Sequence, residues 1–190
     1  MKESLLMQDY WHNNHGYEAM LDFQMSWLMR IAAEKDINKP ELHKISKNVL
    51  LRLIDIDENK KQNVEIGDVK VWRQWKNIDV LAEVNIKVNG LIEQHLVVIE
   101  DKAYTMIHGN QLTRYKEAVN DSYGDTRIPH YWVITFFDES QKNKYEALKV
   151  DCDKAKWKLL SFYDVIGWKD GNFPDTESDL FNEFWLREWY

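Results

Sequence analysis

The chain has 190 residues, of which 44% are hydrophobic and 13% aromatic, a composition typical of one packed domain and not of a disordered chain. The formal net charge of −7 argues against a protein that binds nucleic acid by bulk attraction alone, because such proteins are usually basic. Cys152 is the single cysteine, which excludes an internal disulfide and a cysteine-based zinc cluster. We expect one domain spanning residues 1–190.

The first part of this domain, residues 16–56, has the periodicity of helices. Apolar residues recur at helical spacing between residues 17 and 34, which predicts a first helix. Pro40, a residue favoured in the first turn of a helix, precedes a second apolar stripe that ends at Leu53. The polar residues 58–62 then indicate a loop.

The motif core, residues 64–168, opens with strands, because the apolar period changes there from that of a helix to that of a strand. Residues 64–72 predict a first strand with a break near Gly67. Residues 78–88 and 91–102 predict two further strands separated by Asn89-Gly90. Asn-Gly between apolar stretches predicts a hairpin, because both residues tolerate the positive φ of a type I′ turn.

The second half of the core continues with alternating helices and strands. Residues 110–120 predict a helix, and the nearly uninterrupted apolar run 130–137 predicts a strand covered on both faces. A helix between the hairpin and this strand indicates a crossover connection. Residues 157–160 predict a further strand, along which Lys154, Lys156 and Lys158 would alternate, and residues 162–168 a short helix.

The C-terminal part, residues 176–190, predicts a last helix at 180–189 with Thr176 and Asp179 as its capping pair. The predicted fold class is therefore α/β, with a mixed sheet flanked by helices on both faces. The N-terminus lacks the apolar stretch of a signal peptide. No apolar run approaches the ~20 residues of a membrane helix, so we expect a cytoplasmic protein that does not enter a membrane.

The predicted hairpin permits a register calculation that brings charged residues together. With a two-residue loop at 89–90, opposed residues have numbers that sum to 179. Asp79 and Glu100 meet this condition, which places their Cβ atoms roughly 4.5–5.5 Å apart. Lys102 lies two residues beyond Glu100 and projects from the same face, whereas the Asp101 side chain projects from the other face.

Two facing carboxylates between covered faces repel each other unless a positive charge neutralises them. Carboxylate and carbonyl oxygens suit Mg²⁺ or Mn²⁺, so one interpretation of these charged residues is a divalent-cation site. The other interpretation is purely structural: Lys102 bridges Asp79 and Glu100 as an ion pair near the strand ends. The helix that follows adds Gln111 and Tyr115, which are four residues apart and share one helix face.

Three segments carry a family resemblance: N-I-D-V-L-A-E-V at 77–84, H-L-V-V-I-E-D-K at 95–102 and Q-L-T-R-Y-K at 111–116. Together they resemble the PD-(D/E)XK nuclease superfamily, most closely its small bacterial and phage branch, in which an I-E-x-K strand precedes a Q-L-x-x-Y helix. The proline of the motif is missing here, since Asn77-Ile78 precedes the aspartate. The resemblance implies a restriction-endonuclease-like core.

The resemblance also implies roles for particular residues. The catalytic residues would be Asp79, Glu100, Lys102 and Gln111. The cation, Mg²⁺ or Mn²⁺, would be held by Asp79, Glu100 and the backbone carbonyl of Asp101, with Glu18 of the first helix as a further candidate. Lys102 would orient water and stabilise negative charge. It is not expected to be a strong general base, because two adjacent anions should raise its pKa.

Candidate nucleic-acid contacts flank this motif in the sequence. Arg73, Lys76 and Arg114 could meet phosphates, and Tyr115 could reach the same ligand. The alternative for Tyr115 is a core aromatic whose hydroxyl is satisfied internally, and for Gln111 a polar residue early in a helix.

The expected function is metal-dependent hydrolysis of nucleic acid, with DNA as the expected substrate. An alternative is a catalytically inactive nuclease-fold protein that binds nucleic acid or a protein partner, which the acidic balance favours. A third is an acidic protein that mimics the charge of DNA. A homodimer is a further expectation, since nucleases that cut both strands often act as pairs of subunits.

Overall fold

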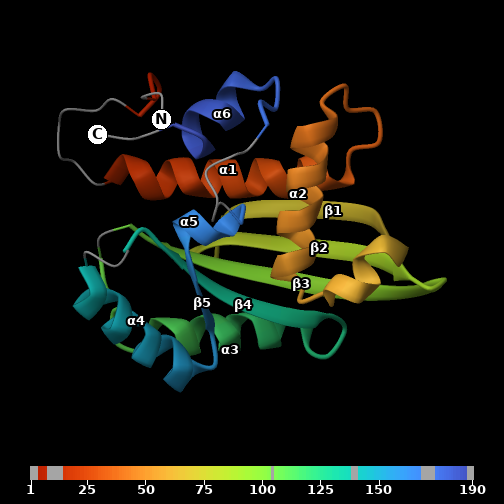
Figure 1. Ribbon diagram of the computed structural model, residues 1–190. Helices are drawn as coiled ribbons and strands as arrows, with labels where there is room; N and C mark the ends of the chain where they lie inside the picture. Colours follow the sequence, from red (N-terminus) through yellow and green to blue (C-terminus); the bar gives the residue numbers. More distant parts are fainter. Residues whose placement is uncertain (1–3, 8–14, 104, 138–140, 168–173, 188–190) are drawn as a thin grey trace.

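The protein folds around one five-stranded sheet with helices on both faces (Figure 1). The computed structural model describes residues 4–7, 15–103, 105–137, 141–167 and 174–187. The strand order is β1-β2-β3-β4-β5. The first three strands run antiparallel, whereas β4 and β5 continue parallel to β3. The predicted α/β class, with a mixed sheet between helices, is confirmed.

The strands lie close to their predicted positions. They are β1 (Val64–Trp75), β2 (Ile78–Val88), β3 (Leu91–Lys102), β4 (Ile128–Thr135) and β5 (Lys158–Ser161). The predicted break near Gly67 is a register shift between Ile66 and Val69. A Cβ atom on Gly67 would lie 3.1 Å from the carbonyl oxygen of Asn85, so this close approach of two strands requires glycine.

The hairpin register is confirmed along the β2–β3 ladder, which pairs residues from Val80 with Ile99 to Val88 with Leu91. Each of these pairs sums to 179. Asn89 and Gly90 have φ values of 49° and 89°, as a type I′ turn requires. Asp79 and Glu100 lie one residue beyond the last pair of this ladder, Val80 with Ile99.

The helices form two layers. They are α1 (His15–Ala33), α2 (Pro40–Leu53), a short 3₁₀ helix η1 (Glu58–Asn63), α3 (Gln111–Tyr123), α4 (Lys142–Ala155), α5 (Phe162–Val165) and α6 (Asp179–Trp185). In Figure 1, α1, α2 and α6 lie above the sheet and α3 and α4 below it. One apolar cluster joins α1, α2, α5 and α6 to the upper face, and a second joins α3 and α4 to the lower face.

Three predictions about the helices were wrong in detail. Residues 58–62 belong to η1 and are not an irregular loop. Helix α4 was not predicted. Lys154 lies on this helix and Lys156 is its left-handed C-cap, with φ 57°, so the three lysines do not alternate along a strand as expected. The cap of α6 is Ser178, whose hydroxyl accepts the Phe181 N–H, whereas Thr176 donates to the side chain of Asn182.

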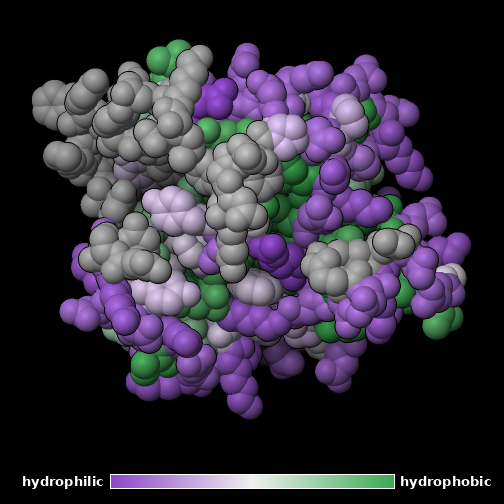
Figure 2. Space-filling view, viewed as in Figure 1, coloured by the Kyte–Doolittle hydropathy of each residue, from purple (hydrophilic) through white to green (hydrophobic). Residues whose placement is uncertain are grey.

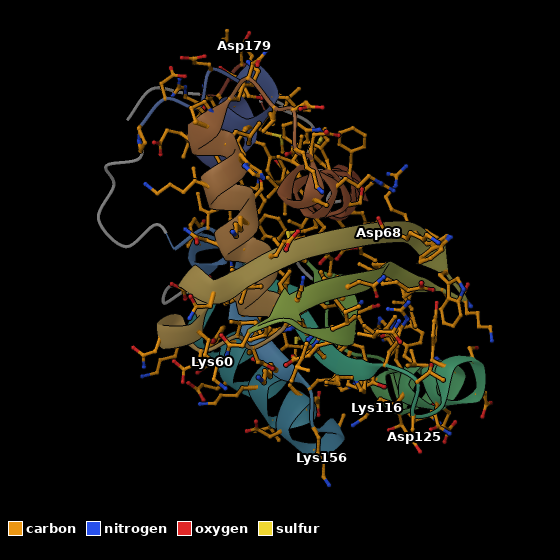
Figure 3. All side chains as sticks on the ribbon, turned by 90° about the vertical axis from the view of Figure 1, so that its right-hand side faces the viewer. Lys60, Asp68, Lys116, Asp125, Lys156 and Asp179 are labelled. Carbon is orange, nitrogen blue, oxygen red and sulfur yellow. The ribbon has the colours of Figure 1, made fainter. Side chains whose placement is uncertain are left out.

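The surface carries charges of both signs. Figure 2 shows hydrophilic side chains over most of the periphery of one face. Figure 3 shows Lys116, Asp125 and Lys156 around the lower helical layer, where positive and negative groups are interspersed. No helix among the described residues is both long and apolar enough to cross a membrane.

Candidate active site

The candidate site lies where β3 ends, between α1 on one face and α3 on the other. A two-residue turn, Lys76-Asn77, with φ values of 51° and 67°, reverses the chain from β1 into β2 and delivers Asp79 to this point. The parallel strand β4 runs beside β3 here, with Glu100 opposite Val133 and Lys102 opposite Thr135. The carboxyl ends of parallel strands are common positions for ligand sites in α/β sheets.

On the α3 side, Glu100 is the centre of a buried hydrogen-bonded chain. The Lys102 ammonium donates to Oε1 of Glu100, and Nε2 of Gln111 donates to the same oxygen at 2.6 Å. Gln111 also lies 2.8 Å from the hydroxyl of Tyr115, which in turn donates to the Asn77 carbonyl at 2.6 Å. The chain therefore connects Glu100 to the turn that carries Asp79.

Asp79 is held by neighbours on both sides. Its Oδ2 accepts the backbone N–H of Asp101 at 2.8 Å, and its Oδ1 accepts from Nε2 of Gln74 at 3.0 Å. The same amide of Gln74 donates to Asp22 on α1 at 3.2 Å. Asp79 therefore sits between the Glu100 chain and a second group of acids that faces α1.

The second group is a pair of buried carboxyl groups, Asp22 and Asp101. Neither can donate while ionised, so both oxygens of Asp101 and Oδ1 of Asp22 lack a partner among the described residues. A proton on either group allows one carboxyl to donate to the other. Burial raises the pKa of Asp22 to about 6, with a further rise from Asp79 and a partial offset by its hydrogen bond with Asp101. Burial and Asp22 raise the pKa of Asp101 well above its usual value.

The electrostatics of Glu100 and Lys102 follow from the same crowding. Burial, with a contribution from Asp79, raises the pKa of Glu100 to about 8, although Lys102 opposes the rise. Burial disfavours the charged form of Lys102, but Glu100, Asp79 and Glu18 outweigh it and raise the pKa of the ammonium. This direction agrees with the expectation that Lys102 stays protonated and is a poor general base.

Glu18 also reaches the end of β3. Its Oε1 accepts the backbone N–H of Ala103 at 2.9 Å and lies 3.4 Å from the Thr105 hydroxyl. Glu18 and Asp22 are four residues apart on α1, so both project from one helix face toward the site.

The site contains residues that the sequence did not single out. Asp22 could have been found from its i,i+4 spacing to Glu18. Gln74 gives no such signal. The position of its side chain depends on a backbone φ of 56°, and glutamine is not a residue type that indicates a positive φ in a sequence.

The other predicted residues lie at different depths. Tyr115 is 8% exposed, and its hydroxyl is engaged inside the protein. Arg73 is exposed, with its guanidinium 5.7 Å from the centre of the Phe23 ring. Lys76 is exposed and donates to the Ser122 hydroxyl at 2.8 Å. Arg114 is exposed on α3.

Comparison with known families agrees with this arrangement. A family model for the PD-(D/E)XK nuclease superfamily matches residues 22–188. The chain belongs to the PD-(D/E)XK nuclease superfamily. No curated protein and no solved structure matches it.

The donor set of this PD-(D/E)XK protein can be tested for its fit to a divalent cation. Among the described residues, no three His, Cys, Asp or Glu side chains already stand in a metal-holding group. Mg²⁺, however, is commonly bound by one or two carboxylates together with water and phosphate oxygens. Asp79 and Glu100 provide two such carboxylates, and within the described part of the chain no hydrogen-bond partner reaches the buried Oε2 of Glu100. The chemistry of the residues therefore fits a hard divalent cation.

Proposed function

We propose that this PD-(D/E)XK protein is a nuclease that hydrolyses phosphodiester bonds of nucleic acid, with DNA as its substrate and Mg²⁺ or Mn²⁺ as its cofactor. The observation that carries the proposal is Glu100. It is 2% exposed, its Oε2 has no donor among the described residues, and it lies beside a second acid, Asp79, which contributes to raising its pKa. Burying a carboxylate in this way is costly unless a positive group compensates it.

Asp79, Glu100 and the backbone carbonyl of Asp101 would hold the cation, and Glu18 is a further candidate, since its contacts with Ala103 and Thr105 are made by Oε1. When bound, a divalent cation polarises the scissile phosphate, acidifies water and offsets the charge that develops in the transition state. The first two residues are rigidly placed, since Asp79 accepts two hydrogen bonds and Glu100 accepts two at a single oxygen.

Lys102 supplies the fixed positive charge of the proposed site. Its raised pKa keeps the ammonium protonated at neutral pH, so it can donate to a phosphate oxygen or to the attacking water but does not remove a proton. Gln111 fixes the orientation of Glu100, and Tyr115 ties Gln111 to the turn before Asp79. Donors that are held in place before the reaction stabilise developing charge most effectively.

A catalytically inactive protein of the same fold, which binds nucleic acid or a protein partner, is the second candidate. The net charge of −7 favours it, because an acidic surface disfavours association with a polyanion. The presence of Asp79, Glu100 and Lys102 together favours the nuclease, since a binding-only protein has no need to bury Glu100 and Lys102 beside a half-buried Asp79.

A plasmid-nicking assay with Mn²⁺ separates the two candidates. The wild type should convert supercoiled plasmid to nicked and linear forms, and Asp79→Ala and Lys102→Ala should each reduce the rate by roughly 10²-fold or more, as removal of one charge-stabilising group does. Lys70→Ala, an exposed lysine on β1, is the matched control and should cleave normally.

Equal cleavage by the wild type and both site variants would identify a contaminant and end the nuclease proposal. Calorimetric titration with Mn²⁺ provides a second measurement. Absence of binding heat at millimolar metal would favour the binding-only protein.

A further inference from the structure

An open cleft of about 710 Å³ lies beside the carboxyl ends of β4 and β5. Its lining includes Lys142 and Tyr145 from α4, Ser161 from the end of β5, and Tyr163 and Asp164 from α5. Its volume is in the range of small-ligand sites. Helix α5 follows β5 directly, and α4 packs beside the same strand (Figure 1).

The cleft lies at the same end of the strands as Lys102. The ladders pair Lys102 with Thr135 on β4, and Thr135 with Ser161 on β5. Adjacent strands are about 4.8 Å apart, so the backbone of Ser161 lies about 10 Å from that of Lys102. A nucleic-acid strand with a phosphate at Lys102 can therefore place a neighbouring nucleotide in the cleft.

The aromatic residues of the cleft offer surfaces on which a base can stack. Tyr145 is half-buried, so it presents part of its ring while remaining anchored, and Tyr163, which contacts the Phe162 ring at a centroid distance of 5.5 Å, lines the same cleft. Stacking on tyrosine requires an unpaired base, because the faces of paired bases in a duplex are already covered by their neighbours.

The charges of the cleft specify what kind of base it can take. The lining carries two carboxylates, Glu146 and Asp164, against one ammonium, Lys142, so the cleft is poorly suited to a phosphate group. Carboxylates accept hydrogen bonds from exocyclic amino groups, as they do from N4 of cytosine. Thymine and uracil carry a carbonyl oxygen at the corresponding position, so they present an acceptor to these acids where cytosine presents an amino donor, and N3–H is the one donor left on that edge.

We propose that this cleft binds an unpaired nucleobase that bears an exocyclic amino group, adjacent to the phosphate at Lys102. The proposal rests on the proposed nuclease function for the position of that phosphate. It makes the substrate of the site a single-stranded or locally unpaired nucleic acid, with cytosine preferred over thymine next to the cleaved bond.

Fluorescence polarisation of labelled oligonucleotides tests the cleft without cleavage, at pH 8 in EDTA. The wild type should bind oligo(dC) several-fold more tightly than oligo(dT), and both more tightly than a duplex. Tyr145→Ala should weaken binding of both single strands by about tenfold, within the range for loss of one base–aromatic stack. Tyr145→Phe, which keeps the ring, should bind as the wild type does.

Glu146→Gln provides a second variant at an exposed helix position, where the fold is not at risk. It should narrow the preference for oligo(dC), because the amide can donate to thymine as well as accept from cytosine. The control is Glu117→Gln, an exposed glutamate on α3, which should leave the preference unchanged.

The outcomes distinguish failure of the proposal about the cleft from failure of the proposed nuclease function. The proposal that the cleft binds a base would be overturned if folded Tyr145→Ala bound single strands as tightly as the wild type and Glu146→Gln kept the full preference for oligo(dC). This would hold even if Mn²⁺-dependent cleavage is found. Binding that depends on Tyr145 but leads to no cleavage with Mn²⁺ would support the cleft and overturn the nuclease.

Discussion

Asp22→Asn tests whether the buried acids of the site destabilise the protein when no metal is present. The pKa of Asp22 rises from 3.8 to about 6 on folding, chiefly because the carboxyl is buried. Each pKa unit corresponds to about 1.4 kcal/mol, so ionising Asp22 in the folded protein costs about 3 kcal/mol more than in the unfolded chain.

The sign of the pH dependence follows from proton binding. Between pH 3.8 and about 6 the folded protein holds the proton on Asp22 more often than the unfolded chain does, so rising pH destabilises the fold. Above pH 6 the cost is fully developed. Asparagine carries no charge, its amide can donate to Asp101, and its carbonyl can accept from Gln74.

Urea unfolding in EDTA measures the effect. At pH 8, Asp22→Asn should raise the free energy of unfolding by up to about 3 kcal/mol, and at pH 4 the gain should nearly vanish. Asp121→Asn, an exposed aspartate on α3, is the control and should show no comparable gain at either pH. A variant that is less stable at both values, or equally stabilised at both, would refute the electrostatic account of this acid pair.

Two further predictions concern other parts of the molecule. His95 and His130 lie with ring nitrogens 3.0 Å apart, and burial lowers the pKa of both below 6.5, with mutual repulsion adding to the effect at His95. The unfolded chain therefore binds more protons than the folded protein as pH falls through 6.5, so the contribution of this pair to stability should decline from pH 7 to 5, opposite in sign to that of the site acids. The difference in unfolding free energy between His95→Gln and the wild type should shift in favour of the variant from pH 7 to pH 5; an equal difference at both values would show that the pair has no such effect. Tyr115→Phe removes the hydroxyl that donates to Asn77 and meets Gln111, so it should lower kcat several-fold with little change in KM, and an undiminished kcat would deny Tyr115 a positioning role.

The sequence predicted the sheet and the proximity of the central candidate residues because both depend on local rules. The Asn89-Gly90 turn determines the β2–β3 register, and that register places Asp79 and Glu100 at the same strand end. Lys102 follows from strand alternation, and Gln111 and Tyr115 follow from helical spacing. Each of these predictions needs only the geometry of one hairpin or one helix.

What the sequence did not predict depends on contacts between distant segments. Asp22 joins the candidate site only because α1 packs across the sheet. The side chain of its partner Asp101 was expected to face away from the candidate catalytic residues, with only the backbone carbonyl of Asp101 contributing to the site. Helix α4 was missed because only Leu148 and Cys152 are buried along it, so its apolar stripe is too sparse to show helical periodicity.

The distribution of unfavourable features supports a functional origin for the site. Gln74, Lys76 and Asn77 all have positive φ, a conformation that costs energy in residues other than glycine. They cluster immediately before Asp79. Beside them lie carboxylate oxygens of Asp101 and Glu100 that, while ionised, find no donor among the residues that the structure describes. A core selected for stability alone would replace such residues with glycine in the turn and apolar side chains on β3, as the remainder of that strand does with Val97, Val98 and Ile99. Strain and buried charge concentrated at one strand end are what a site selected for chemistry retains.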